Sequence, residues 1–177
     1  MKNFVVDANE KYVIFGKYPQ ENQEPEPIKW RILENKRNSL LLIADKILDC
    51  HKFDYLQTDF DNSELKVWLN TYFFDNAFNL EEKQIIIKQN GSYVSLLQEK
   101  QALKMNKDDL KRFVTNYAKN QGVHISLFNK GYGWWWLKTQ KPALPLEAGV
   151  VVDSGNICYH FIRDDSIGIV PVIIVKV

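Results

Sequence analysis

The chain has 177 residues, the usual size of a single domain. Its 23 Lys and Arg against 22 Asp and Glu leave a formal net charge of +1, which excludes the basic footprint expected of a nucleic-acid or anionic-membrane binder. Charges interrupt the N-terminus before a secretory apolar region can form, and no stretch reaches the roughly 18 uncharged apolar residues of a membrane span.

Two cysteines, Cys50 and Cys158, are too few for a disulfide framework and do not form a CxxC motif. We interpret them as buried, reduced thiols and expect a cytoplasmic protein. The sequence contains no internal repeat, low-complexity segment or linker. It therefore predicts one domain that spans residues 1–177.

The first part of the chain is β-prone. Strands are predicted at residues 12–15, 28–33 and 40–44. In the second run, apolar residues alternate with Lys29 and Arg31, which is the period of a half-buried strand. The third run is continuously apolar and favours a strand covered on both faces. Prolines and acids at 20–27 predict an extended, solvated loop.

Two helices are predicted next. The first spans residues 62–74, with apolar residues at the spacing of one helix face: Leu65, Trp68, Leu69, Tyr72 and Phe73. Asp61, Asn62 and Ser63 are its N-cap candidates, and we expect Trp68 and Leu69 to be largely buried against the sheet. A shorter helix covers residues 80–87, where Asn79 can cap while Glu82 reaches back.

A third helix is predicted over residues 107–121. Its apolar face follows the same spacing: Leu110, Phe113, Val114, Tyr117 and Ala118. Asn106 is a plausible cap and Gly122 a plausible stop. Asp108 and Asp109 balance the basic residues in the first turn, so we interpret this surface as a solvated helix face rather than a nucleic-acid site.

The remaining segments are β-like. Strands are predicted at residues 134–137, 149–153, 156–161 and 167–177, and a short run at 93–97 precedes the third helix. Ser154-Gly155 favours a hairpin, and Pro171 indicates an edge or a bulge because proline cannot donate to a sheet. The fold class predicted is therefore α+β, with a mostly antiparallel twisted sheet packed by about three helices.

Several motifs occur in an order that resembles a known family. They are Phe-Gly-Lys-Tyr-Pro-Gln at 15–20, Pro-Ile-Lys-Trp-Arg-Ile-Leu at 27–33, Leu-Asp-Cys at 48–50, Asn-Ser-Glu-Leu at 62–65, Trp-Leu-Asn at 68–70, Ala-Phe at 77–78, Glu-Glu-Lys at 81–83 and Trp-Trp-Leu at 135–137. This combination resembles the bacterial domain-of-unknown-function family numbered 6273, over residues 12–177. The resemblance implies a bacterial protein, a fold and a location, but no activity.

The family's C-terminal part, with its paired tryptophans and glycine hairpin, is similar to C-type-lectin-like folds. This chain departs from the family pattern at two places. Val170 stands where an arginine is expected, and Lys138-Thr139 stands where Arg-Ser is expected. Both departures fall at positions where the family's arginines would be expected to bind a ligand.

Three adjacent tryptophans are the most distinctive feature. In a strand, Trp134 and Trp136 face one side and Trp135 the other, so a sheet covered on one face would leave one set available. One interpretation is core packing from both faces. The other is a surface that stacks on a ligand, which the nearby Gly131 and Gly133 would let approach closely. On the second interpretation, the predicted ligand-binding residues are Trp134, Trp135, Trp136 and Lys138.

Other chemistries have less support in the sequence. Cys50-His51 are adjacent and would point apart in a strand, and no motif marks Cys158 or His160 as activated. Residues 59–64 lack the glycine of a calcium loop, and the histidines lack zinc-ligand spacing. There is no glycine-rich phosphate loop.

We therefore expect a non-enzymatic binding or interaction module that recognises a protein or small ligand through loops and an aromatic surface. No catalytic residue, metal or cofactor is predicted, and no nucleic acid or membrane is expected as a partner. The alternative is an enzyme with a dispersed thiol/His site, built from Cys50, Cys158 and His160 and related to formylglycine-generating-type folds. A purely structural or assembly role is a third hypothesis.

Overall fold

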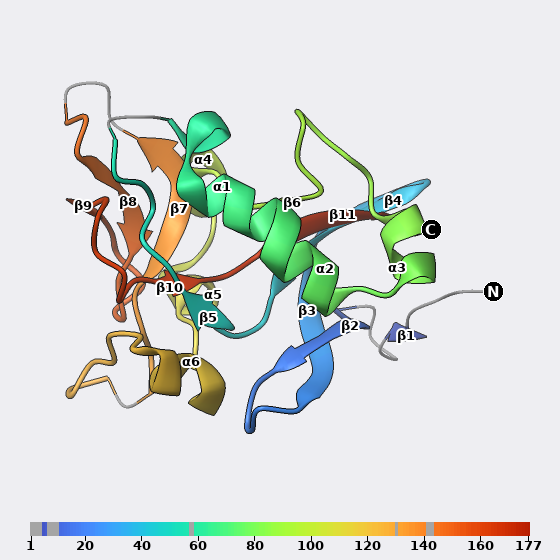
Figure 1. The fold of residues 1–177 in the computed structure, drawn as a ribbon, viewed down its shortest axis with the longest axis horizontal. Helices are drawn as coiled ribbons and strands as arrows, with labels where there is room; N and C mark the ends of the chain where they lie inside the picture. Colours follow the sequence, from blue (N-terminus) through green and yellow to red (C-terminus); the bar gives the residue numbers. More distant parts are fainter. Residues whose placement is uncertain (1–4, 7–10, 57–58, 130, 141–143) are drawn as a thin grey trace.

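The computed structural model describes residues 5–6, 11–56, 59–129, 131–140 and 144–177. These residues form two mostly antiparallel sheets and several short helices, which confirms the α+β class (Figure 1). The six-stranded sheet has the order β1 (Val5–Val6), β2 (Tyr12–Pro19), β3 (Pro25–Lys36), β4 (Ser39–Ala44), β11 (Val172–Lys176) and β6 (Val94–Ser95). The five-stranded sheet has the order β5 (Asp49–Cys50), β10 (Gly168–Ile169), β7 (Trp135–Gln140), β8 (Glu147–Val151) and β9 (Ile157–Phe161).

The chain passes from one sheet to the other at Val170 and Pro171. Strand β10 pairs with β5 and β7 in the five-stranded sheet, whereas β11 pairs with β4 and β6 in the six-stranded sheet. The edge strand predicted at Pro171 was wrong, because both halves of the run are interior strands, but the run is interrupted at this residue. Proline is tolerated at the junction, where its carbonyl accepts the amide of Ala44 at 3.0 Å and no donor is required of it.

A helix crosses in front of the junction between the sheets (Figure 1). It follows a short 3-10 turn (Phe60–Asn62) and consists of α1 (Glu64–Trp68), a π-helical turn (Leu69–Phe73) and α2 (Phe74–Ala77). The helix and one of its cap candidates are confirmed, since the Ser63 hydroxyl accepts the amide of Lys66 at 3.1 Å.

The π-helical turn changes which side chains of this helix are buried. A π turn is wider than an α turn, so residues four apart come into line along the helix. Leu65, Leu69, Phe73 and Ala77 are buried, whereas Trp68 is partly buried and Tyr72 is 51% exposed. The prediction that Tyr72 belongs to the apolar face was therefore wrong.

Helix α3 (Leu80–Ile85) begins with the predicted capping box. Asn79 accepts the amide of Glu82 and Glu82 accepts the amide of Asn79, both at 2.9 Å. The other oxygen of Glu82 accepts the amide of Gly16 at 3.0 Å, which connects the helix to the bulge in β2. A side chain at Gly16 would meet the carbonyl oxygen of Ala77 at 2.7 Å, so glycine is required there. The helix ends two residues earlier than predicted, because Ile87 donates its amide to β11 at 2.7 Å.

The third predicted helix is broken in the middle, which corrects the sequence interpretation. Only α5 (Lys107–Leu110) and α6 (Asn116–Gln121) are helical, and α4 (Glu99–Ala102) precedes them. Between α5 and α6, Phe113 forms a β-bridge with Tyr132 and Val114 forms one with Ile47. Tertiary pairing therefore outweighs a helical period in this segment. Gly122 ends α6 in the left-handed conformation, at φ 112°, as predicted.

Two further loops can be compared with the predictions. The β8–β9 hairpin is confirmed, with Gly155 at φ +81° in its turn. The solvated loop predicted at 20–27 is shorter, because β3 begins at Pro25, which pairs with Pro19 of β2. Gln20 is buried, and its amide group donates to the carbonyl of Pro27 at 2.9 Å.

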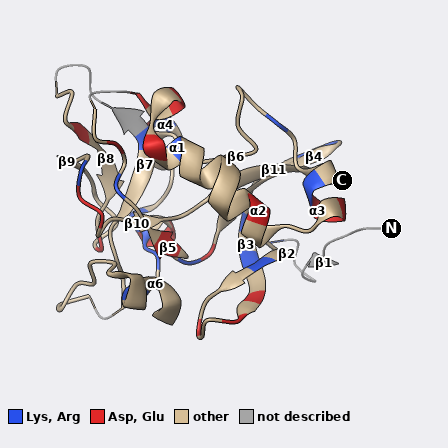
Figure 2. Ribbon diagram, in the orientation of Figure 1, with Lys and Arg blue, Asp and Glu red and all other residues tan. Residues whose placement is uncertain are grey.

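The described charged residues of both signs are distributed over both halves of the molecule (Figure 2). In the described residues, no helix has the length and apolar character needed to cross a membrane.

Candidate functional site

Strand β7 is covered on both faces, so two of the three adjacent tryptophans belong to the core. Trp135 and Trp136 are both fully buried. The indole N–H of Trp135 donates to the carbonyl of Leu110 at 3.1 Å, and that of Trp136 donates to the carbonyl of His51 at 2.8 Å. For this pair the interpretation of core packing from both faces holds, because the segment around Leu110 covers one face of the strand and the segment around His51 covers the other.

Trp134 lies just before β7 and is only partly buried. His124 and His160 meet its ring edge-on, at centroid distances of 5.4 and 5.5 Å. Its indole N–H donates to a carboxylate oxygen of Asp153 at 3.3 Å. Trp134 is therefore the member of the run that retains accessible aromatic surface.

A short loop next to Trp134 carries the two most exposed apolar side chains of the described residues. Leu127 is 91% exposed and Phe128 is 95% exposed. The Ser126 hydroxyl accepts the amides of Phe128 and Asn129, at 3.2 and 3.0 Å, and this turn fixes the backbone of the loop. We call Trp134, His124, His160, Asp153 and Asn129, together with Leu127 and Phe128, the Trp134 surface.

Asp153 connects the loop to the ring of Trp134. One of its oxygens accepts from the side-chain amide of Asn129 at 2.6 Å, and the other accepts from Trp134. Burial alone would raise the pKa of Asp153, but hydrogen bonds from Ser126, Asn129 and Trp134 outweigh it and lower that pKa. The carboxylate is therefore charged at neutral pH and holds both donors.

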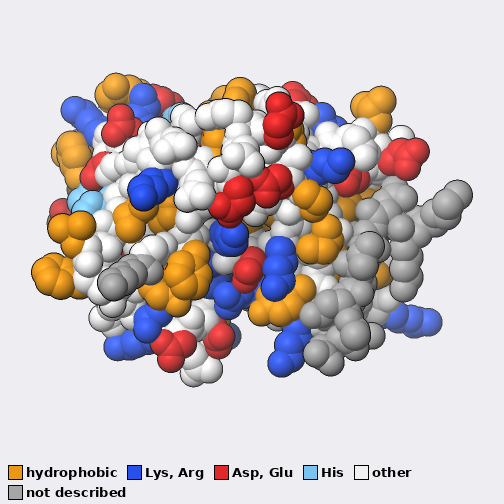
Figure 3. Space-filling model, turned by 90° about the horizontal axis from the view of Figure 1, so that it is seen from below, with side chains coloured by type: hydrophobic (Ala, Val, Ile, Leu, Met, Phe, Trp, Pro, Cys, Tyr) orange, Lys and Arg blue, Asp and Glu red, His pale blue; other side chains and the backbone are white. Residues whose placement is uncertain are grey.

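Figure 3 shows hydrophobic side chains gathered beside a histidine on the left of the molecule, the side of the five-stranded sheet.

The glycines that flank the tryptophans are explained by packing. A side chain at Gly131 would meet the ring of Phe113 at 3.1 Å, and one at Gly133 would meet Val114 at 2.6 Å and Ile47 at 3.0 Å. These glycines admit neighbouring side chains of the protein. The expectation that they leave room for a ligand has no support in this packing.

His160 forms a hydrogen-bonded pair with Asp164 beside Trp134. Its ring nitrogen lies 2.6 Å from one carboxylate oxygen, and the Ser166 hydroxyl donates to the other at 2.7 Å. Burial would raise the pKa of Asp164, but the bonds from Ser166 and His160 lower it. The serine hydroxyl is bonded to the carboxylate rather than to the imidazole, so the histidine is not placed to act as its base.

The two thiols lie at opposite edges of the five-stranded sheet, in β5 and β9. Four strand spacings separate them, about 19 Å along a flat sheet. Burial raises the pKa of the Cys50 thiol to about 12, helped by Asp49 and other nearby carboxylates, and burial also raises the pKa of Cys158. Both thiols are therefore protonated at neutral pH, and the dispersed site of the enzyme hypothesis is not assembled around a thiol pair.

Cys50 lines a polar pocket of about 350 Å³ together with His51, Lys52, Arg163 and Asp165. The Cys50 thiol lies 3.4 Å from the carbonyl of Gln121, and His51 is bonded to the carbonyl of Lys52 at 2.7 Å. Both groups are engaged with backbone carbonyls, so His51 is not directed at the thiol. Among the residues that the structure describes, no group of three His, Cys, Asp or Glu side chains is arranged to hold a metal ion.

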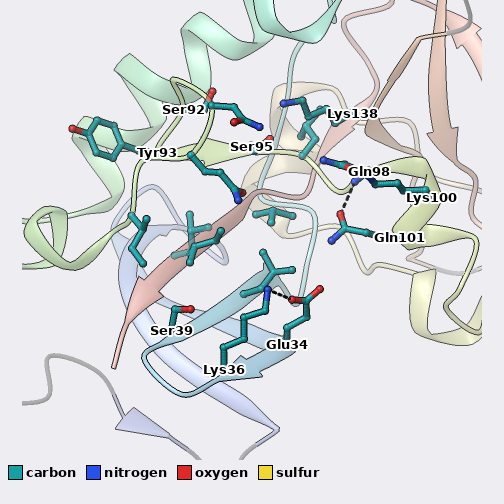
Figure 4. A pocket seen from close by; sticks show the side chains of 18 residues that line it. Glu34, Lys36, Ser39, Ser92, Tyr93, Ser95, Gln98, Lys100, Gln101 and Lys138 are labelled. Carbon is teal, nitrogen blue, oxygen red and sulfur yellow. Dashed lines mark hydrogen bonds and ion pairs between the residues drawn. The ribbon is translucent and has the colours of Figure 1, made fainter.

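The side chain of Lys138 has different neighbours from those of the three tryptophans. Its ammonium lies 3.2 Å from a carboxylate oxygen of Asp61 and 4.9 Å from the centre of the Phe60 ring. It lines a second pocket, of about 270 Å³, which none of the three tryptophans lines (Figure 4). The four predicted binding residues therefore divide among the core, the Trp134 surface and this pocket.

Comparison of the chain with protein-family models, curated proteins and solved structures gave no match. The resemblance to the family numbered 6273 and the similarity to C-type-lectin-like folds therefore remain predictions from the sequence.

Proposed function

We propose that this protein is a non-enzymatic binding module that recognises a protein partner through the Trp134 surface. The observation that carries the proposal is the exposure of Leu127 and Phe128, at 91% and 95%, on a turn in which the amides of Phe128 and Asn129 are hydrogen-bonded to Ser126. A large apolar side chain in water gains free energy when it enters an apolar pocket. Exposed apolar groups of this kind are typical of interaction sites.

The order of the loop supports recognition rather than chance exposure. Besides the bonds of Ser126, the amide of Tyr132 donates to Asn129 at 3.0 Å, and the amide of Ser126 donates to Tyr132 at 3.2 Å. Asn129 is also tied to Asp153. A loop that is ordered before binding loses less conformational entropy when its partner arrives, which raises affinity.

The composition of the surface fits a protein partner. Phe128, Leu127 and the partly buried Trp134 supply apolar anchors, and aromatic anchors commonly dominate the energy of protein interfaces. Three polar side chains lie against Trp134, namely His124, His160 and Asp153. An apolar centre with a polar rim is the usual anatomy of such an interface.

The proposal is tested by capture of partners from a cell lysate with the parent and with matched variants. Leu127→Ser/Phe128→Ser removes the exposed anchors, and Leu80→Ser removes an apolar side chain that is 79% exposed on α3. Both variants are expected to melt like the parent, since exposed side chains contribute little to stability.

Quantitative mass spectrometry should then identify at least one protein that the parent and Leu80→Ser capture and that the loop variant does not. Direct titration of that protein should show at least a tenfold loss of affinity in the loop variant, the effect of losing one anchor worth about 1.4 kcal/mol. Identical sets of captured proteins for all three forms would contradict the proposal.

A further inference from the structure

A second candidate site is the pocket that contains Lys138, and this pocket shares no residue with the Trp134 surface. The pocket has a volume of about 270 Å³ and is formed by segments far apart in the sequence. Its floor belongs to the outer face of the six-stranded sheet. Leu41 pairs with Ile174, and both are partly exposed, whereas their neighbours Leu42 and Ile173 point inward and are buried.

The floor is aliphatic. Leu41 of β4 and Val172 and Ile174 of β11 contribute to it, and Ile87 lines the pocket beside them. Residues paired directly across antiparallel strands lie on the same face, which places these side chains together. The floor is therefore suited to a compact apolar body.

One end of the pocket is rich in hydrogen-bond donors. Figure 4 shows Lys138, Gln98, Lys100 and Gln101 grouped at this end, with Glu34 and Lys36 at the other side of the floor. Glu34 and Lys36 form an ion pair at 2.8 Å, so their charges offset each other. The donor end has no carboxylate among the residues that line the pocket.

The two lysines at the donor end are incompletely neutralised. Asp61, the partner of Lys138 at 3.2 Å, is shared with Lys66 at 3.7 Å, so one carboxylate faces two ammonium groups. Lys100 has no ion-pair partner among the described residues. Its neighbour Glu99 accepts from the hydroxyl of Tyr159 at 2.7 Å and is turned to another contact.

The side chain of Gln101, at this end of the pocket, has one hydrogen-bonding group that is not used within the protein. The side-chain oxygen of Gln101 accepts the backbone amide of Gln98 at 3.2 Å, which leaves its NH₂ group as a donor.

Ser92 also lines the pocket wall, and its buried hydroxyl has no hydrogen-bond partner among the described residues. A buried polar group without a partner is unfavourable, so the wall has polar capacity that the protein does not use.

From these observations we propose that the pocket binds a small organic anion, with its carboxylate or phosphate between Lys100, Lys138 and Gln101 and its apolar body on the aliphatic floor. Donors without acceptors at one end select an acidic group, and a floor of aliphatic side chains selects against inorganic anions. The volume limits the ligand to a small molecule.

The experiment is a titration of the ¹⁵N-labelled protein, followed by its amide NMR signals. Hexanoate and phenyl phosphate are the anionic probes, hexan-1-ol is the neutral probe of similar size, and inorganic phosphate is the anion without an apolar body. The proposal expects saturable shifts of amides in 95–101 and 172–174 with at least one anionic probe. Affinity for hexan-1-ol and for inorganic phosphate should be at least tenfold weaker. Comparison of hexanoate with phenyl phosphate distinguishes a carboxylate ligand from a phosphate ester.

Matched variants localise the binding. Lys100→Gln should lower the affinity for the anionic probe about fivefold, the effect of losing one exposed ion pair. Lys104→Gln removes the same charge from an exposed residue that follows α4 and does not line the pocket, and it should change the affinity less than twofold. The proposal is overturned if no anionic probe saturates, if hexan-1-ol binds as tightly as the anions, or if both variants have the same effect.

Discussion

Trp136 and Trp134 are two residues apart, yet they lie in two different regions of the molecule. Trp136 is fully buried between the segments that cover β7, and its N–H is bonded to a backbone carbonyl. Trp134 is partly exposed, and its N–H is bonded to the side chain of Asp153. A backbone acceptor fixes an indole within the fold, whereas a surface side chain can exchange its partner when a ligand arrives.

Carboxylates show the same contrast between the interior and the surface. Burial raises the pKa of Asp49, although Tyr18 donates to it at 2.5 Å and the amide of Cys50 at 2.8 Å. At the surface, bonds from Ser166 and His160 lower the pKa of Asp164 in spite of partial burial. Residue type therefore does not decide the chemistry of these groups. The balance between burial and hydrogen bonds does.

The largest expected effect follows from removing a large side chain from the core. Trp136→Ala should lower the free energy of unfolding by about 3–5 kcal/mol, because a large cavity replaces a ring that packs on Phe53 at 5.5 Å. Urea unfolding followed by circular dichroism measures the change. A variant that unfolds like the parent would remove the distinction between interior and surface tryptophans.

An intermediate effect concerns Asp49 and its dependence on pH. A folded-state pKa above the unfolded value means that the stabilising contribution is complete at low pH and is lost as the pH rises through the folded pKa. Asp49→Asn keeps the shape and cannot ionise. Its free energy of unfolding should therefore decline less than that of the parent between pH 4 and pH 7, in urea titrations at each pH.

Asp164→Asn is the matched control, and its expected effect on the pH dependence of stability has the opposite sign. Its lowered folded-state pKa means that the contribution is present at neutral pH and is lost as the pH falls below about 4. The variant should therefore lose less stability than the parent under acid conditions. Equal pH profiles for the parent and Asp49→Asn would show that Asp49 ionises in the fold as it does in water.

The sequence predicted the elements whose stability is local. Ser63 and the apolar spacing after it predicted the central helix, and Asn79 with Glu82 predicted the capping box of α3, because each signal lies within a few residues. The π-helical turn at Leu69–Phe73 was not predictable from that spacing, and it displaced Tyr72 from the buried face.

Tertiary contacts decided the elements that the sequence predicted incorrectly. Residues 107–121 have the same apolar spacing as the central helix, but Phe113 and Val114 pair with Tyr132 and Ile47 instead. Arg112, between the two short helices, is fully buried and donates to backbone carbonyls, and burial lowers its pKa to about 10. No local pattern in the sequence indicates such a buried arginine.

The candidate sites were predictable only in part. Trp134 and Lys138 stand in one run of the sequence, but the structure separates them into two sites. The apolar pair Leu127-Phe128 between Ser126 and Asn129 was a local signal that could have been recognised, since turn residues flank exposed apolar ones. The pocket wall comes from segments between Glu34 and Ile174, and only the fold brings them together.

The smallest expected effect on stability comes from Trp134→Phe, which keeps an aromatic ring between His124 and His160 and removes the N–H. The lost bond to Asp153 should cost about 1 kcal/mol or less of unfolding free energy. Because Asp153 also holds Asn129, the loop should lose order, and the amides of Phe128 and Asn129 should exchange with solvent faster than in the parent. Partner affinity should fall with this loss of order, even though Leu127 and Phe128 are unchanged. Unchanged hydrogen exchange together with unchanged capture would show that Trp134 contributes only packing, and recognition would then rest on the two loop residues alone.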